Sequence, residues 1–263
     1  MTTIDLADHE GNADLDRDDY EKQLLTLQRQ LEKLQAAYIN QGLKAIIAIE
    51  GWDAAGKGGL ITRLVGPLDH RFTKVWSIGA PTREEAARHY LWRFWQRLPA
   101  TREITIFDRS WYGRVLVERV DKLVTKPVWL RAYDEINAFE AMQLADGVRI
   151  VKLFLHISQA EQDKRLKERI ETPWKRWKTG TDDYHNRSMR PEYLKAYADM
   201  FERTSTDAAP WTVLAANDKK SARIKGLRVV VDVLSKDIDL DYPPAPAALI
   251  AIAEKALGTT IAV

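Results

Sequence analysis

The stretch EGWDAAGKGG, residues 50–59, decides the fold of this chain. It follows the pattern of a phosphate-binding loop (P-loop), in which Gly is followed by four residues, then Gly-Lys, then Ser or Thr. Gly51, Gly56 and Lys57 are in place, but Gly58 stands where a Mg²⁺-binding hydroxyl is usual, and Asp53 lies inside the loop. The loop therefore lacks one magnesium ligand and carries a carboxylate that the pattern does not require.

The glycines of this loop favour phosphate binding over a turn that serves packing alone. Glycine permits unusual backbone dihedrals and lets phosphate oxygens approach the backbone. Free N–H groups at the start of the following helix form a nest for anions, and Lys57 reaches the phosphate oxygens. The predicted phosphate-binding residues are Gly51, Ala54, Ala55, Gly56, Lys57, Gly58 and Gly59.

Composition places the chain among ordinary globular proteins. It has 263 residues, 45% apolar and 30% charged, with no cysteine and a net charge of +2. The cysteine count excludes a disulfide scaffold and a thiolate metal site. We find no apolar run of about 18 residues and no secretory signal at the polar N-terminus. We therefore expect a cytoplasmic protein with no membrane or nucleic-acid partner, and any polyanion-binding surface must be a local one.

Strand patterns alternate with helix patterns along the chain. Disorder is predicted for residues 1–16, a single P-loop domain for 17–240 with a lid at about 160–190, and a tail with a short helix for 241–263. We expect strands at 44–50, 74–82, 103–108, 148–158 and 210–216, and helices at 17–40, 60–69, 82–98, 127–145, 159–171, 184–204 and 218–236. Thr82 and Glu85 form a capping-box pattern. This alternation predicts an α/β fold with a mostly parallel sheet covered on both faces.

The stretch IFDRSWYGR, residues 106–114, supplies a second acid. Asp108 closes an apolar strand, as a Walker B acid does, and would lie across from the loop. Since Mg²⁺ prefers oxygen ligands, Asp53 and Asp108 are the candidate metal ligands, one on each side of the phosphate chain. The alternatives are that Asp53 caps the following turn and that Asp108 pairs with an arginine.

Basic residues gather in KRLKERIETPWKRWK, residues 164–178, and in the helix pattern that follows Thr82. Arg165 and Arg169 are four residues apart and would share a helix face. A lid of this charge would neutralise a transferring phosphoryl group and exclude water; the alternative is a solvated charged helix. No histidine has a suitably spaced metal-ligand partner, and we assign no catalytic histidine. The expected channel and lid residues are Arg83, Arg93, Arg165, Lys175, Arg176 and Lys178.

Four stretches together resemble the motif set of polyphosphate kinase family 2: GWDAAGKGG, APTREE, DRSWYGRVLVERV and RTSTDAAPW. The resemblance covers about residues 44–236. It implies a thymidylate-kinase-like P-loop fold, a three-layer sandwich with a five-stranded sheet and a helical lid. It also implies Mg²⁺-dependent transfer of phosphate between inorganic polyphosphate and adenine or guanine nucleotides. The family's catalytic positions fall on Asp53, Lys57, Asp108, Arg109 and the lid's Arg169.

Within that family, the chain resembles the branch that phosphorylates AMP, which often has two fused copies where this chain has one. The ADP-using branch tends to have Arg and Asn at the positions of Trp52 and Gly113. Trp52 could set the position where the acceptor's phosphate stops, or it could pack. We expect a homo-oligomer, either a dimer or a tetramer. The alternatives are an ATP-dependent nucleoside monophosphate kinase and a non-catalytic polyanion- or RNA-binding protein.

Overall fold

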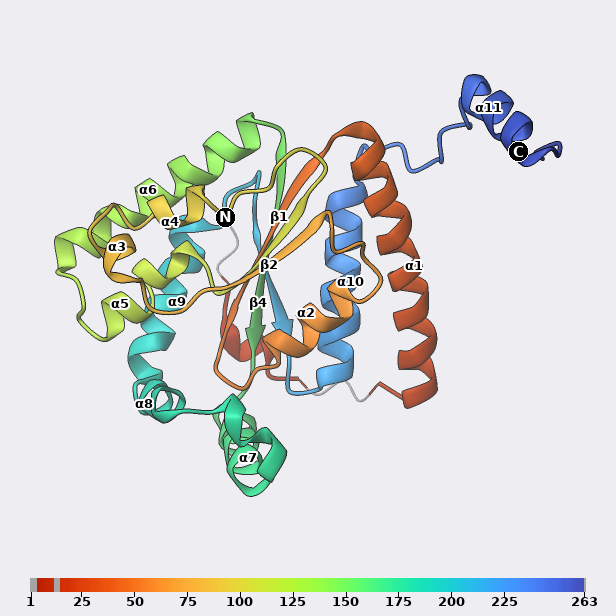
Figure 1. The fold of residues 1–263 in the computed structure, drawn as a ribbon. Coiled ribbons are helices and arrows are strands. Elements are labelled where there is room, and N and C mark those ends of the chain that lie inside the picture. The colour runs from red at the N-terminus through yellow and green to blue at the C-terminus, as the bar shows by residue number, and fades with distance from the viewer. Residues whose placement is uncertain (1–3, 12–14, 263) are drawn as a thin grey trace.

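The fold is built on one sheet, in which all strands run parallel. The computed structural model describes residues 4–11 and 15–262, and within them five strands pair in the order β2-β3-β1-β4-β5 (Figure 1). The predicted α/β class and parallel sheet are confirmed. The strands are β1 (Lys44–Gly51), β2 (Thr73–Ser77), β3 (Ile104–Asp108), β4 (Val148–His156) and β5 (Trp211–Ala215).

Helices cover both faces of the sheet and complete the three-layer sandwich. One face carries α1 (Arg17–Gln41), α2 (Lys57–Val65) and α10 (Lys219–Ser235). The other carries α5 (Val117–Val120), α6 (Lys126–Ala145) and α9 (Arg190–Thr204), together with the short η2 (Trp111–Arg114). Beyond the carboxyl end of β4 lies the lid segment, made of α7 (Gln159–Glu171), η3 (Pro173–Lys178) and α8 (Thr181–Ser188).

Strand β1 is central because its side chains are buried on both faces. Ile46, Ile47 and Ile49 are at most 1% exposed, and the strand pairs with β3 on one side and β4 on the other. A near-continuous apolar run is the expected sequence of a strand buried in this way. The loop that follows β1 therefore leaves the sheet between the ends of its two neighbours, where parallel α/β folds bind their ligands.

Two predicted helices are interrupted. The prediction of one helix over 82–98 is wrong: the structure has α3 (Arg83–Ala86) and α4 (Trp92–Trp95), although the Thr82–Glu85 capping box is present. The chain turns between them so that Phe94 packs edge-to-face on Phe107 and Trp111 in the core. The helix expected over 184–204 breaks before α9, where Pro191 lacks the N–H that an uninterrupted helix would need.

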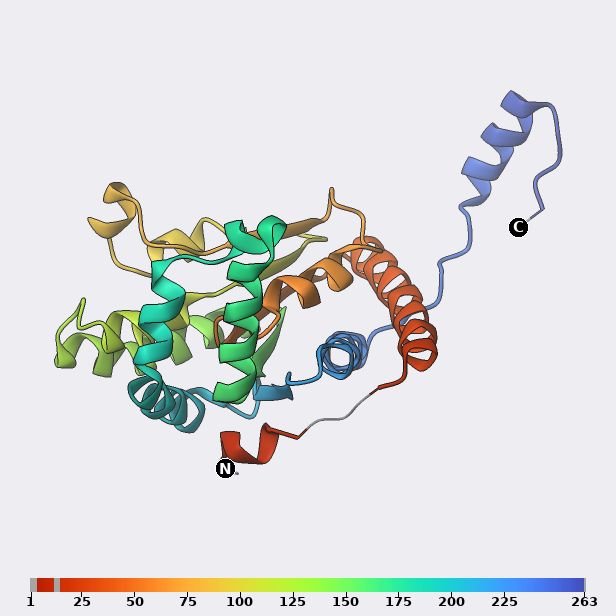
Figure 2. The same ribbon diagram turned by 90° about the horizontal axis from the view of Figure 1, so that it is seen from below.

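The N-terminal segment packs against the body of the protein, whereas the C-terminal helix does not. Residues 1–16 were expected to be disordered, but η1 (Leu6–His9) packs against β5 with Leu6 buried (Figure 2). The backbone carbonyl of Glu10 also accepts a hydrogen bond from Asn217 Nδ2 at 2.9 Å. Residues 1–3 and 12–14 lie outside the described part. At the other end, α11 (Ala247–Leu257) stands clear of the body with no buried side chain (Figures 1 and 2).

A buried ion pair joins the sheet to the α6 and α9 layer. Lys152 in β4 is 1% exposed, and its Nζ donates to Glu140 Oε2 at 2.8 Å and to the Thr204 carbonyl at 2.7 Å. Glu140 also accepts hydrogen bonds from Trp111 Nε1 and from the Tyr112 hydroxyl. Both charges thus have partners, which buried charges require. The network fixes how helices α6 and α9 sit on β4.

We expect Lys152→Met to lower the free energy of unfolding by about 3–5 kcal/mol, because it leaves the Glu140 carboxylate buried without its cation. Urea unfolding followed by circular dichroism measures this. The control is Glu21→Gln in the exposed Arg17–Glu21 pair of α1, which should change stability by less than about 1 kcal/mol. A loss of similar size in both variants would show that the buried network contributes no more than a surface pair.

Candidate active site

The loop between β1 and α2 has the backbone of a phosphate-binding loop. Gly51 and Gly56 have φ of 139° and 108°, and Ala54 has φ of 64°. A Cβ on Gly51 would lie 2.4 Å from the Leu155 carbonyl oxygen, so the close approach of β4 requires glycine there. Ala54 accepts a left-handed conformation that costs a non-glycine residue about 1–2 kcal/mol. Such strain persists only where the surroundings hold it.

Lys57 lies at the first position of α2 and folds back over the loop. Its side-chain Nζ donates to the carbonyls of Gly51 and Trp52, at 2.8 and 3.0 Å. Burial, and then the neighbouring Arg109, lower the pKa of Lys57, while Asp53 and other carboxylates act in the opposite direction. This cation is therefore placed where a phosphate oxygen could replace the two carbonyls as its partner.

Asp53, inside the loop, is held by hydrogen bonds to both of its carboxylate oxygens. Its Oδ1 accepts from Arg109 Nη2 at 2.7 Å, and its Oδ2 accepts from Asn186 Nδ2 at 2.8 Å. Burial alone would raise its pKa, but Lys57, Arg109 and the Asn186 hydrogen bond together hold the pKa of Asp53 below its usual value. The carboxylate is thus kept ionised inside the loop. It does not cap the following turn, since both of its oxygens are bound elsewhere.

Asp108 ends β3 and lies beside Ile49 of β1 in the sheet register. Its Oδ1 is buried and has no hydrogen-bond partner among the described residues. Arg109 follows with φ of 62°, and its backbone N–H donates to the Ile49 carbonyl at 3.0 Å. This left-handed turn sends the Arg109 side chain back toward Asp53. The structure thereby brings together the predicted residues Asp53, Lys57, Asp108 and Arg109.

Sequence analysis missed a third carboxylate, Glu50, which is 5% exposed at the end of β1. Its Oε1 accepts from the backbone N–H and the hydroxyl of Ser110, at 2.7 and 2.8 Å. Burial raises the pKa of Glu50, opposed by the Ser110 hydrogen bonds and by Lys57 and Arg109. A charged residue ending an otherwise apolar strand was the available signal. Asn186, the other missed partner, had none, because its contact with Asp53 spans 133 positions.

The two lid arginines that were expected to share a face have separate roles. Arg165 is 4% exposed and lies beneath the loop, where its donors bind the carbonyls of Ala54, Ala55, Ala216 and Asn217 and the Glu161 carboxylate. All five guanidinium N–H groups are thereby used. No donor remains for a phosphate, so the expected channel role of Arg165 does not fit its position.

Arg169 lies one turn further along α7 and is partly exposed. Its Nη1 donates to the Lys178 carbonyl at 3.0 Å and lies 3.5 Å from Asp183 Oδ1. Lys175 pairs with Glu168, and Arg176 Nε donates to the Ile170 carbonyl. The Lys178 ammonium lies over the ring of the exposed Trp177. The basic run thus makes its contacts within the lid segment, through single ion pairs and hydrogen bonds to carbonyls that a polyanion could replace.

The two remaining expected channel residues, Arg83 and Arg93, also differ in their exposure. Arg83 is exposed and makes no ion pair or hydrogen bond through its guanidinium within the described ranges. Arg93 is mostly buried, 3.5 Å from Glu85 Oε1, and donates to the Gly79 carbonyl. Trp52 is 3% exposed: its Nε1 donates to His156 Nδ1 at 2.8 Å, and Arg190 lies 3.9 Å over its ring. Trp52 therefore packs, which is the second of the two roles expected for it.

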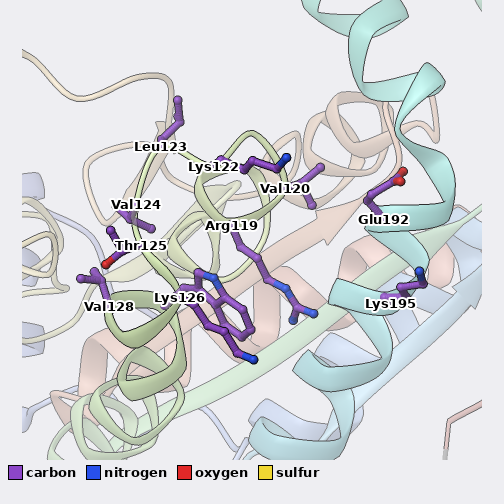
Figure 3. A pocket seen from close by; sticks show the side chains of 11 residues that line it. Arg119, Val120, Lys122, Leu123, Val124, Thr125, Lys126, Val128, Glu192 and Lys195 are labelled. Carbon is purple, nitrogen blue, oxygen red and sulfur yellow. The ribbon is translucent and has the colours of Figure 1, made fainter.

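A hollow of about 690 Å³ lies outside the loop, between the segment that joins α5 to α6 and helix α9 (Figure 3). Trp129 and Arg119 form part of its wall, and the ammonium groups of Lys122, Lys126 and Lys195 surround it. It adjoins the lid segment through Asp121, which pairs with His185 of α8 at 3.0 Å. None of the predicted site residues lines this hollow.

The residues around the loop fit a magnesium ion held jointly by protein and phosphate. Among the described residues, no group of three or more His, Cys, Asp or Glu side chains forms a metal cage. Mg²⁺ does not need one, because it keeps several waters and binds through one or two carboxylates together with substrate phosphates. Asp108 offers a buried, unpartnered oxygen, and Asp53 offers an ionised carboxylate.

None of the helices in the described ranges is both long and apolar enough to cross a membrane.

Comparison with known proteins finds one family. The family model "Polyphosphate kinase 2" matches residues 14–240. A polyphosphate:AMP phosphotransferase of Pseudomonas aeruginosa is 47% identical over 220 residues, which are 84% of this chain and 44% of that protein. The chain thus spans less than half the length of that relative. An AMP/ADP-polyphosphate phosphotransferase of Meiothermus ruber is 39% identical over 221 residues, 84% of this chain and 82% of that one.

A solved structure supports the fold over nearly the whole chain. The polyphosphate kinase 2 of Arthrobacter aurescens superposes with a TM-score of 0.86 at 33% identity, covering 97% of this chain and 90% of that one.

The raised pKa of Glu50 predicts a pH dependence of stability. Between its unfolded pKa, about 4.3, and its higher folded pKa, the folded protein binds more protons than the unfolded chain. The free energy of unfolding therefore falls as the pH rises through that window, by about 1.4 kcal/mol for each unit of pKa shift. Glu50→Gln removes this titration and keeps an acceptor for Ser110. The stability of the variant relative to wild type should rise with pH above about 4.3 and then level off.

Urea unfolding at a series of pH values checks this prediction. The matched control is Glu171→Gln, which removes an exposed carboxylate of α7 and tests whether the loss of any carboxylate gives the same slope. A constant difference between Glu50→Gln and wild type at every pH would mean that Glu50 does not titrate across this range.

Proposed function

Because the chain belongs to the polyphosphate kinase 2 family, we propose that it transfers a phosphoryl group from inorganic polyphosphate to AMP, with Mg²⁺ as cofactor. One observation carries the proposal most directly. The loop has no hydroxyl at Gly58, yet an ionised carboxylate, Asp53, lies within it, and another acidic side chain, that of Asp108, ends the adjacent strand β3. An ATP-dependent kinase of this fold uses the hydroxyl for its metal. The carboxylate pair suits a more highly charged phosphate chain.

The residues of the loop position the phosphate chain. The backbone N–H groups of Ala54 and of residues 56–59 surround the phosphate that will be transferred, whereas the Ala55 N–H is bound to the Trp52 carbonyl. The start of α2 favours the negative charge of that phosphate. Lys57 exchanges its carbonyl partners for phosphate oxygens, and this exchange restores a full charge partner to a buried cation. Arg109, held by Asp53, contributes a second cation on the β3 side of the chain. Catalysis then consists of alignment and electrostatic stabilisation.

Asp53 and Asp108 would hold the magnesium ion. When bound, the ion neutralises charge on the phosphate oxygens and helps to hold donor and acceptor in line. Asn186 and Arg109 keep the Asp53 carboxylate oriented and ionised. Among the described residues, the histidine beside the loop is not placed as a covalent carrier: His156 is buried against Trp52, and its pKa is lowered to about 4, mainly by burial. We therefore propose direct transfer from donor to acceptor.

The lid segment supplies the remaining charge. Arg169 is the lid cation that we assign to the transferring phosphoryl group, and Lys175, Arg176 and Lys178 are assigned to the rest of the polyphosphate. Their present partners are carbonyls, two carboxylates and an exposed ring, which a phosphate chain can replace at little cost. Arg83, exposed and free within the described ranges, is assigned to the same polyanion.

AMP is the acceptor that the comparisons favour. The relatives whose names specify AMP are 44–49% identical to this chain, whereas those named for ADP are 38–40% identical. The relative named for both is 39% identical. An ADP site must hold the nucleoside one phosphate further from the donor, so the two acceptors require different depths.

We expect the purified protein with Mg²⁺ and AMP to form ADP when long-chain polyphosphate is the donor, and to form far less when ATP replaces it. Chromatographic separation of the nucleotides measures this. Asp53→Asn and Asp108→Asn should each lower turnover by roughly 10²–10³-fold, the usual effect of removing one group that stabilises transition-state charge. Their circular dichroism spectra should match wild type.

The control for the two variants is Asp232→Asn, which changes an exposed aspartate of α10 outside the site and should keep wild-type turnover. Efficient transfer from ATP with none from polyphosphate would identify a nucleoside monophosphate kinase. Binding of polyphosphate without transfer would identify a polyanion-binding protein. Normal turnover in either variant would remove that aspartate from the metal site.

The acceptor preference is a separate prediction. With AMP and ADP as competing acceptors, AMP should be phosphorylated at least as efficiently as ADP, because a nucleoside misplaced by even about 1 Å can cost about 10²-fold in rate. Steady-state values of kcat/KM for each acceptor decide the matter. A preference for ADP of about tenfold, equal to about 1.4 kcal/mol of transition-state binding, would contradict the assignment to AMP and leave the donor assignment standing.

A further inference from the structure

The loop's backbone carbonyls present a problem that its N–H groups do not. A loop that turns its N–H groups toward an anion must turn its carbonyls away from it, where they need other donors. One of these carbonyls, that of Trp52, has a backbone donor in the Ala55 N–H at 3.1 Å. In the structure, side chains supply donors to five consecutive carbonyls, those of residues 51–55. Lys57 binds the first two, Gln162 binds the third and Arg165 binds the last two. Three side chains therefore hold the shape of the whole loop.

Two of these three side chains come from α7, the first helix of the lid segment. Gln162 Nε2 donates to the Asp53 carbonyl at 3.1 Å, and Arg165 Nη1 donates to the carbonyls of Ala54 and Ala55 at 3.1 and 3.0 Å. Arg165 Nη2 also binds the carbonyls of Ala216 and Asn217 just after β5, at 2.7 and 2.9 Å. The loop is thus tied both to α7 and to the far side of the sheet.

The orientation of the Gln162 amide is fixed by a second contact. Its Oε1 accepts from Arg190 Nη1 at 2.9 Å, and Gln162 itself is 1% exposed. A guanidinium has no acceptor, so the oxygen of the amide must face Arg190 and the nitrogen must face the loop. Arg190 in turn donates to the Ile157 carbonyl and covers the ring of Trp52. The donor to the Asp53 carbonyl is therefore locked in place by α9.

Of the three side chains, Lys57 is the one whose hydrogen bonds to the loop carbonyls are lost when a phosphate binds. Under the proposed function its ammonium turns to the phosphate, which leaves the first two carbonyls without that donor. Of the three side chains, only the two from α7 then still hold the loop around its left-handed residue, Ala54, beside the backbone hydrogen bond from Ala55 to the Trp52 carbonyl. Arg165 cannot itself reach the phosphate, because its five donors are all used and its side chain is buried.

We propose that Gln162 and Arg165 are positioning residues, which hold the loop's carbonyls outward so that its N–H groups stay aimed at the bound phosphate chain. The proposal rests on the proposed function only in taking the loop's ligand to be a phosphate chain. It assigns Arg165 a role that depends on the forked geometry of its guanidinium and not on its charge. It also makes the lid's first helix part of the phosphate site itself.

Two conservative variants test the proposal in the full chain. Arg165→Lys keeps the charge and loses the fork, while Gln162→Glu keeps the acceptor for Arg190 and loses the donor to the loop. Each should lower kcat, by about 10²-fold for Arg165→Lys, the cost of a misplacement of about 1 Å. The KM for polyphosphate should change by the same factor for short and long chains. The matched controls are Gln159→Glu, an exposed amide on the same helix, and Arg131→Lys on α6.

A second readout does not depend on activity. In hydrogen–deuterium exchange without ligand, peptides covering residues 51–60 should exchange faster in both variants than in wild type, while peptides from β4 should be unchanged. If Arg165→Lys lowers kcat without faster loop exchange, or affects only the KM for long chains, Arg165 acts on the phosphate through its charge and the proposal is wrong. If Arg165→Lys does not fold, Gln162→Glu decides by the same criteria.

If the wild-type protein transfers nothing from polyphosphate, the proposed function fails. The exchange experiment still tests whether Gln162 and Arg165 hold the loop. Unchanged exchange at residues 51–60 in both variants would overturn it in that case as well.

Discussion

The concentration of charge at the carboxyl ends of β1 and β3 is the constraint that the rest of the molecule satisfies. Three carboxylates, Glu50, Asp53 and Asp108, lie there with two cations, Lys57 and Arg109. Buried charges are costly unless each has partners, and nearly every unusual local feature serves to supply one. Ser110 satisfies Glu50, and the left-handed turn at Arg109 returns a cation to Asp53. The exception is Asp108, whose buried Oδ1 has no hydrogen-bond partner among the described residues.

The sequence was sufficient for those parts of the fold that depend on local pattern. Strand β1, the loop and the start of α2 follow from an apolar run, glycine spacing and a lysine, and the structure places them as predicted. The predicted helix over 82–98 failed because its pattern of apolar residues does not show that Phe94 must reach the core across a turn. The break before α9 was visible as Pro191 but was not used.

The site itself was predictable only where one motif contains the residue. Asp53, Lys57, Asp108 and Arg109 belong to two short motifs that parallel strands bring to the same edge of the sheet. Arg165 and Arg169 are four residues apart on one helix, yet one is fully used beneath the loop and the other faces the lid. Spacing places side chains on a helix face, but it does not show which neighbour that face meets. Asn186 and Gln162 were missed for the same reason, since their partners lie more than 100 positions away.

The contact of η1 with β5 has a consequence for how the molecule folds. Glu10 bonds to Asn217 across 207 positions, and its carboxylate lies 3.4 Å from Nε2 of His156, the residue that holds Trp52 of the loop. Tyr38 similarly reaches the Leu234 carbonyl across 196 positions. Contacts of such separation form late, because the entropy of closing long chain segments must be met before they contribute. The support behind the phosphate loop is therefore completed only when the two halves of the chain have met. A nascent chain that still lacks β5 would have the whole glycine-rich motif and no working site.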